Sequence, residues 1–234
     1  MPTVEGAESL APRRPPSLLS SICHDLKAPL ASIVMGAGFL RRVLPAGDES
    51  ARRVAEAIAH AADRMNEFIA VLSDLARLEA REVTLDVKPH AVASVLRQAC
   101  DRIHPEAAAQ GVPLGLDAGA EVDALLVACD ATRLQQALRY LAACALRVVP
   151  EGGTVALRAK PDATYVRFTV EAERGPGTGH RLVQGDIPQP ELAIARGLVE
   201  LHGGVLEVGG DDESLAMSFA LNVQGVTSIA EARP

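Results

Sequence analysis

The chain has 234 residues, a formal net charge of −7 and 48% hydrophobic residues, with no tryptophan. A chain of this size can bury its own core, and its acidic balance argues against DNA or RNA as a partner, because nucleic-acid binding depends on clustered Lys and Arg. The four cysteines form no C-x-x-C pair, and no run of about 18 apolar residues occurs, so we expect a cytoplasmic protein with reduced thiols, no metal site and no membrane partner.

The first part of the chain predicts a helical hairpin. Residues 1–16 are rich in Pro and Arg and are expected to be a disordered lead-in. Apolar residues then recur every three or four positions between residues 19 and 44, and again between residues 54 and 78 behind a helix cap at Asp48. Two helices alone cannot enclose both apolar seams, so residues 17–81 are expected to form a homodimer with a four-helix bundle.

The rest of the chain alternates between strand and helix patterns. A linker is expected at 82–88, an α/β sandwich over 89–223 and a flexible tail over 224–234. Helices are predicted near 91–110, 130–147 and 190–202. Strands are predicted at 83–87, 112–116, 124–129, 154–159, 165–171, 204–208 and 214–221. The predicted fold class is therefore α+β, a long helical hairpin followed by a sandwich.

His24 begins the segment H-D-L-K-A-P-L in the middle of the first predicted helix. At about 100° per residue its side chain points roughly 160° away from the apolar seam near Leu26, so we expect an exposed imidazole. Pro29 removes one helical hydrogen bond, at a cost of about 3 kcal/mol. Asp25 beside the imidazole could hold one ring nitrogen protonated and orient the other for attack on a phosphoryl group.

With Ser32 and Ile33 behind it, this segment closely resembles the histidine box of sensor histidine kinases, and L-A-R-L-E-A at 75–80 resembles the end of that family's dimerisation domain. The resemblance implies that His24 is the phosphorylated residue and Asp25 its activating acid. It also implies a histidine-kinase ATPase fold, of the Bergerat type, for the second domain. The implied partners are a response-regulator receiver domain and an upstream histidine kinase.

The resemblance extends to the ATP-binding motifs, but their chemistry is missing. Residues 134–153 align with the asparagine box, 171–177 look like the first glycine box, and the second glycine box should directly precede 192–204. The two asparagines, the aspartate of the first glycine box and the glycines of the second are all replaced. Neither Tyr nor Cys supplies the hard amide oxygen that magnesium favours. The eleven residues between Gly177 and Gln189 are too few for the family's lid. We therefore expect no binding of ATP or magnesium and no self-phosphorylation. The replaced positions are Tyr140, Cys144, Glu173, Gln189 and Glu191.

A receiver domain is expected to dock beside the histidine. His24 shares one side of the helix with four small or adaptable residues, Ala28, Ala31, Met35 and Gly38. Lys27 lies at the border of this side and is included in the expected docking surface. The alternative is that the small residues only pack against the neighbouring helix. Where related kinases often carry a Thr or Asn that positions the hydrolytic water, this chain has Ala28, so weak phosphatase activity is expected.

Three functions stay open. The leading hypothesis is a histidine phosphotransferase that carries a phosphoryl group on His24 between receiver aspartates, or from a partner kinase, without autokinase activity. The first alternative is a non-catalytic pseudokinase that regulates by binding a kinase or a response regulator. The second is an active histidine kinase with an unusual nucleotide site.

Overall fold

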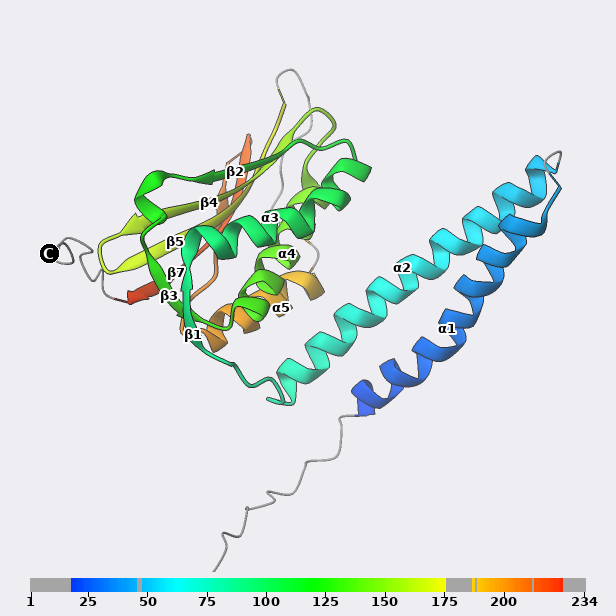
Figure 1. Ribbon diagram of the computed structural model, residues 1–234, viewed down its shortest axis with the longest axis horizontal. Coiled ribbons are helices and arrows are strands. Elements are labelled where there is room, and N and C mark those ends of the chain that lie inside the picture. The colour runs from blue at the N-terminus through cyan, green and yellow to red at the C-terminus, as the bar shows by residue number, and fades with distance from the viewer. Residues whose placement is uncertain (1–17, 46–47, 176–186, 188, 212, 225–234) are drawn as a thin grey trace, which may run out of the picture. The chain divides into compact units, whose positions relative to one another are not determined.

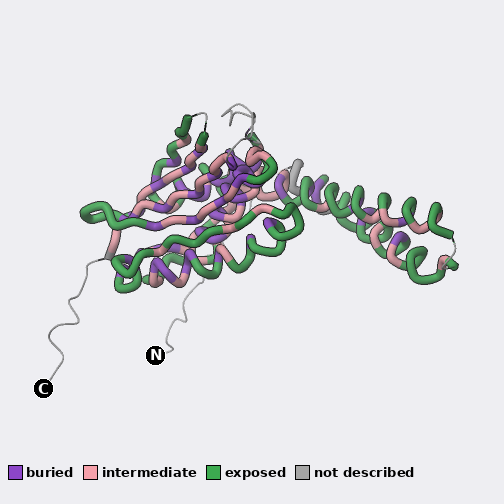
Figure 2. Tube along the Cα trace, turned by 90° about the horizontal axis from the view of Figure 1, so that it is seen from above, coloured by how far each residue is buried: buried purple, intermediate pink, exposed green. Residues whose placement is uncertain are grey.

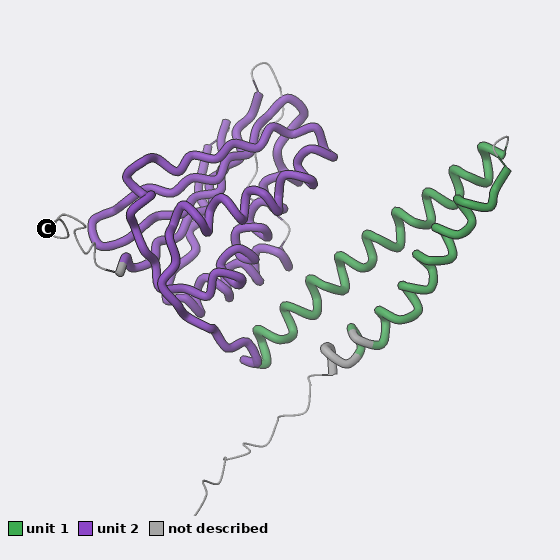
Figure 3. Tube along the Cα trace, viewed as in Figure 1, with its two compact units in different colours: residues 1–80 green, residues 81–234 purple. Residues whose placement is uncertain are grey.

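The computed structural model describes residues 18–45, 48–175, 187, 189–211 and 213–224, without the side chains of residues 18–21, 24 and 224. The predicted lead-in, the eleven residues between Gly177 and Gln189 apart from Ile187, and nearly all of the predicted tail lie outside the described residues. The chain divides into two compact units, and the boundary in the sequence falls between Ala80 and Arg81 (Figure 3). Arg81 adopts a left-handed backbone conformation, with φ of 55°, directly after the last helical turn of the first unit.

The first unit is the predicted hairpin of two helices, α1 (Leu18–Val43) and α2 (Glu49–Glu79) (Figure 1). Asp48 caps α2 as expected, because its Oδ1 accepts a hydrogen bond from the backbone N–H of Ala51 at 3.0 Å. Pro29 lies inside α1, where it interrupts the hydrogen-bond ladder without ending the helix. Both predicted helices are confirmed.

The two helices bury a narrow core between them and leave a second apolar surface open. The core consists of Cys23 and Leu30 from α1 with Ala62 and Ile69 from α2. Eight larger apolar side chains, displaced from this core by roughly 60° on each helical wheel, remain between 40% and 59% exposed on one side of the hairpin. This surface, called the apolar face below, comprises Ile22, Leu26, Ile33, Leu40, Val54, Ile58, Met65 and Phe68.

The second unit is a mixed sheet covered on one face by three helices (Figure 1). The strand order is β1-β3-β7-β5-β4-β2, with β6 paired to β7, and only β2 and β4 run parallel. The strands are β1 (Lys88–Ala91), β2 (Leu114–Ala118), β3 (Leu126–Cys129), β4 (Thr154–Asp162), β5 (Tyr165–Glu173), β6 (Glu207–Gly210) and β7 (Ser214–Gln224). The helices are α3 (Val92–Ala109), α4 (Ala131–Val148) and α5 (Gln189–Leu201), with a 3-10 turn, η1 (Ala120–Val122).

Most of the buried residues of the protein lie between this sheet and its helices, whereas the hairpin helices are largely exposed (Figure 2). Alternate residues of β5 face the helices, among them Phe168, which stacks on Phe219 of β7 with ring centroids 5.2 Å apart. The helical hairpin followed by an α/β sandwich confirms the predicted α+β class.

The strand predicted at 83–87 is wrong, because the first strand is Lys88–Ala91, paired antiparallel with β3. The preceding segment has no strand partner; instead the backbone N–H of Asp86 donates to Asp130 Oδ2 at 3.1 Å. Asp130 also caps α4, since its Oδ1 accepts from the N–H of Arg133 at 3.1 Å. Burial raises the pKa of Asp130, but these two hydrogen bonds, together with the charges of Arg133 and His202, outweigh it and hold the pKa below its usual value.

The strand predicted at 204–208 also begins later, at Glu207. Gly203 adopts a φ of +80°, and the N–H of Gly204 donates to the carbonyl of Val199 at 3.0 Å, so these residues close the end of α5. The other predicted helices and strands of this unit match the observed bounds more closely, within about four residues.

Candidate functional site

The histidine segment lies near the start of α1. His24 stands six residues after Leu18, with its side chain outside the described residues, and Asp25 next to it is exposed. One turn later, Pro29 is exposed as well. The helix therefore exposes Asp25 and Pro29 on its surface, whereas Leu30, the last residue of the segment, lies in the core of the hairpin.

The predicted docking residues follow along the same helix. Lys27, Ala28, Ala31 and Met35 are exposed, and Met35 retains 69% of its accessible surface. The hydroxyl of Ser32 donates to the carbonyl of Ala28 at 3.3 Å, along the helix and not toward α2. The two alanines therefore do not pack against the neighbouring helix of the hairpin, which was the alternative explanation for them. Gly38, half-buried, lines a pocket near the hairpin end.

In the second unit, two replaced ATP positions lie one turn apart on α4. The side chains of Tyr140 and Cys144 are 1% and 0% exposed, so they form part of the core. The guanidinium carbon of Arg139 lies 4.6 Å from the centre of the Tyr140 ring, a cation-π distance. A magnesium ligand needs an oxygen directed at a solvent-accessible ion, and these two buried side chains offer none.

A third replaced position, on α5, forms an ion pair with a residue of α4. Glu191, in the first turn of α5, is buried, and its Oε1 lies 3.3 Å from Nη2 of Arg147 on α4. Burial raises the pKa of Cys144 to about 12, and the nearby charge of Glu191 contributes, with Arg147 opposing it. Cys144, Arg147 and Glu191 therefore gather at one place, with the thiol protonated and a carboxylate paired to a guanidinium.

The remaining replaced positions lie elsewhere. Gln189 is exposed at the start of α5, and its amide donates to the carbonyl of Ile187 at 3.1 Å. Glu173, the residue in place of the adenine-reading aspartate, points to the face of the sheet opposite the helices, because it follows the buried Ala172 in the strand. There Arg158 Nη2 lies 3.1 Å from Glu173 Oε1.

Two groups of functional interest were not singled out from the sequence. Arg147 is the partner of Glu191, and three arginines, Arg41, Arg42 and Arg52, line the pocket at the hairpin end. The second group had a sequence signal, because a short turn between antiparallel helices brings the last turn of one next to the first turns of the other.

The described part of the chain contains no cluster of three or more His, Cys, Asp or Glu side chains arranged to hold a metal ion. Within the same residues, no helix has the length and apolar character needed to cross a bilayer.

Comparison with known proteins agrees with this geometry. Residues 17–81 match the family described as His Kinase A (phospho-acceptor) domain. The Sensor protein DivL of Caulobacter vibrioides is 31% identical over 197 residues, which cover 80% of this chain and 25% of DivL. The chain belongs to the sensor histidine kinase family. It combines that family's phospho-acceptor hairpin with an ATPase-like domain. The chain spans less than half the length of the curated relatives it matches, from 25% to 46%.

Solved structures share the fold. ShkA, crystallised at full length in complex with AMPPNP, superposes with a TM-score of 0.71 at 24% identity and covers 90% of this chain and 46% of its own. ThkA, crystallised in complex with the response regulator protein TrrA, has a TM-score of 0.59 at 16% identity and covers 89% of this chain and 61% of its own.

Proposed function

We propose that this protein is a histidine phosphotransferase of two-component signalling, which carries a phosphoryl group on His24 between receiver aspartates, or from a partner kinase, without using ATP. One observation carries the proposal. The hairpin keeps the complete histidine segment, whereas Tyr140 and Cys144 are buried where the family's magnesium-binding amides would stand. Glu191 supports it, because a buried glutamate side chain, ion-paired to Arg147, stands where the family's second glycine box has a glycine.

The transfer needs no nucleotide if the donor is an aspartyl phosphate. A ring nitrogen of His24 attacks the phosphorus, a P–N bond forms, and the P–O bond to the receiver carboxylate breaks, so that the carboxylate leaves as an anion. Asp25 is assigned the role of holding the proton on the other ring nitrogen. Because the donor and acceptor phosphates are both labile, the exchange runs in either direction, and catalysis consists mainly of positioning.

The proposal includes a homodimer. The apolar face exposes eight large apolar side chains together, a surface typical of an interaction site, and it lies on the side of α1 away from His24. Pairing this face with that of a second copy completes a four-helix bundle and leaves both copies of His24 accessible to receivers.

A second candidate function is regulation by binding alone. The second unit retains its full sheet and helices although its nucleotide contacts are replaced, which favours a role for it as a docking body. In that case His24 carries no phosphate, and the protein acts by pairing with a kinase or sequestering a response regulator.

The test separates these functions from an atypical active kinase. The full chain is incubated either with radioactive ATP and magnesium, or with a panel of phosphorylated receivers without nucleotide. The proposal expects label from receivers on wild type, none on His24→Gln, and none from ATP on any variant. His60→Gln serves as the matched control, since His60 is an exposed histidine on α2. Label from ATP alone contradicts the proposal in favour of an active kinase, and no label from any source favours the binding role.

A further inference from the structure

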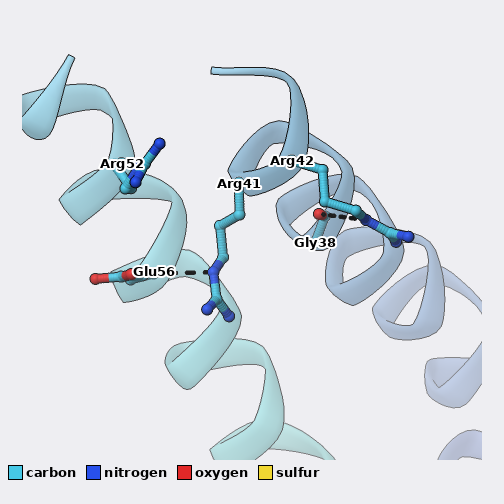
Figure 4. A pocket seen from close by; sticks show the side chains of 5 residues that line it. All are labelled: Gly38, Arg41, Arg42, Arg52 and Glu56. Atoms are coloured by element: carbon cyan, nitrogen blue, oxygen red, sulfur yellow. Dashed lines mark hydrogen bonds and ion pairs between the residues drawn. The ribbon is translucent and has the colours of Figure 1, made fainter. Parts of the chain in front are cut away.

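A pocket of about 420 Å³ lies between the two helices near the hairpin end (Figure 4). Its lining comes from both helices: Gly38, Arg41 and Arg42 of α1, and Arg52 and Glu56 of α2. The lining thus carries three guanidinium groups and one carboxylate, in a protein whose overall charge is −7. The pocket is a positively charged spot on an acidic molecule.

The charges of this pocket are only partly satisfied within the hairpin. Arg41 Nε lies 3.9 Å from Glu56 Oε1, a distant and exposed ion pair, and Arg42 Nε donates to the carbonyl of Gly38 at 3.3 Å (Figure 4). Arg52 Nε is buried, and no group of the described residues accepts a hydrogen bond from it. A buried donor without an acceptor is unfavourable, and an anionic acceptor is the group that best matches a guanidinium.

The pocket lies on the histidine side of the hairpin. Gly38 and Arg42 follow His24 by 14 and 18 residues. At 100° per residue, their directions around the helix axis lie within about 40° of that of His24, and at 1.5 Å per residue they lie roughly 21 to 27 Å from it along the axis. The exposed Ala31 and Met35 lie between them on the same side. A domain of about 100 residues has a radius of gyration of about 13 Å and is roughly 35 Å across, so one bound domain can span this distance.

We propose that this pocket receives an acidic side chain of the receiver domain docked over His24, and so selects which receivers exchange phosphate with this protein. The inference rests on the proposed phosphotransfer function and adds the chemistry of partner choice. A planar carboxylate can accept two parallel hydrogen bonds from one guanidinium, which gives geometric as well as electrostatic selection. Receivers with a basic or neutral residue at that position leave the arginines unpaired and dock less well.

The test compares changes of arginine charge inside and outside the pocket. Arg42→Glu and Arg52→Gln alter pocket residues, whereas Arg53→Glu is the matched control, an exposed arginine one position further along α2 that does not line the pocket. Phosphotransfer rates are measured for full-length protein against a panel of phosphorylated receivers, with thermal melts to verify folding. The expected result is a loss of about tenfold in kcat/KM, through KM, for the pocket variants, with the control near wild type. An acid-to-arginine change on the receiver should restore transfer to Arg42→Glu.

Several results would overturn the inference. Equal losses in Arg53→Glu, or wild-type rates in both pocket variants, would remove the pocket from partner choice. Calorimetry with pyrophosphate tests a different occupant. If the wild type binds pyrophosphate at micromolar concentration, and Arg42→Glu abolishes this binding but leaves receiver exchange unchanged, the pocket is a small-anion site instead. If no receiver exchanges phosphate with wild-type protein, the proposed function fails by itself. Calorimetric binding of unphosphorylated receivers then still decides the pocket, because Arg42→Glu must weaken it.

Discussion

The substitution Leu26→Glu tests the dimer most severely. Leu26 belongs to the apolar face and is 45% exposed in the single chain. Full burial of such a side chain contributes about 1.5 to 3 kcal/mol, so covering its exposed half in a dimer contributes about 1 kcal/mol. Eight residues of this kind give about 8 kcal/mol per subunit, and twice that in the dimer can offset an association cost of about 4 to 15 kcal/mol.

A glutamate at position 26 removes that contribution and adds the desolvation of a carboxylate, which costs several kcal/mol for each ion. The two copies together therefore weaken the dimer by at least about 4 kcal/mol, or about a thousandfold in Kd. Light scattering and sedimentation from nanomolar to micromolar concentration measure this change. Lys27→Glu is the control, because the same glutamate then stands on an exposed position off the face. A wild-type monomer at micromolar concentration, or a dimer of unchanged affinity in Leu26→Glu, would refute the reasoning.

Three further predictions concern single residues. Because burial raises the pKa of Cys144 to about 12, iodoacetamide at pH 8 should label the half-buried Cys100 well before it, as followed by peptide mass spectrometry; rapid labelling of Cys144 argues against a closed core. Ala31→Arg should block exchange with receivers while leaving the dimer and the melting temperature unchanged, and unfolding or a wild-type rate places docking elsewhere. Asp130→Ala should lower the free energy of unfolding by about 1 kcal/mol at pH 7 by denaturant titration. Since the folded-state pKa of Asp130 is lowered, that difference is fully present above the usual pKa of 3.8 and disappears as the pH falls through the lowered value; a difference that persists at lower pH contradicts its electrostatic origin.

The elements that could be predicted from the sequence are those set by local pattern. The seams of α1 and α2 repeat over many turns, and Asp48 is a helix cap by residue type alone, so both ends of the hairpin turn were expected. The helix α4 was also expected, because its apolar residues keep helical spacing on both sides of Tyr140 and Cys144.

The elements that could not be predicted depend on non-local pairing. Which face of a strand a side chain takes changes with a shift of one residue, so the side of the sheet that Glu173 occupies depends on the register of its strand. Similarly, Arg147 and Glu191 are 44 residues apart, and only the packing of α5 on α4 brings them to 3.3 Å. The segment before β1 has a strand-like composition, but the hydrogen bond between Asp86 and Asp130 takes the place of a strand partner.

The most direct test of the central claim is phosphorus NMR of the full chain mixed with a phosphorylated receiver, in parallel with a sample that contains only ATP and magnesium. A phosphoramidate signal should appear in the receiver sample, disappear in His24→Gln, and be absent from the ATP sample. A phosphoramidate signal that forms from ATP alone, or one that persists in His24→Gln, would contradict the account.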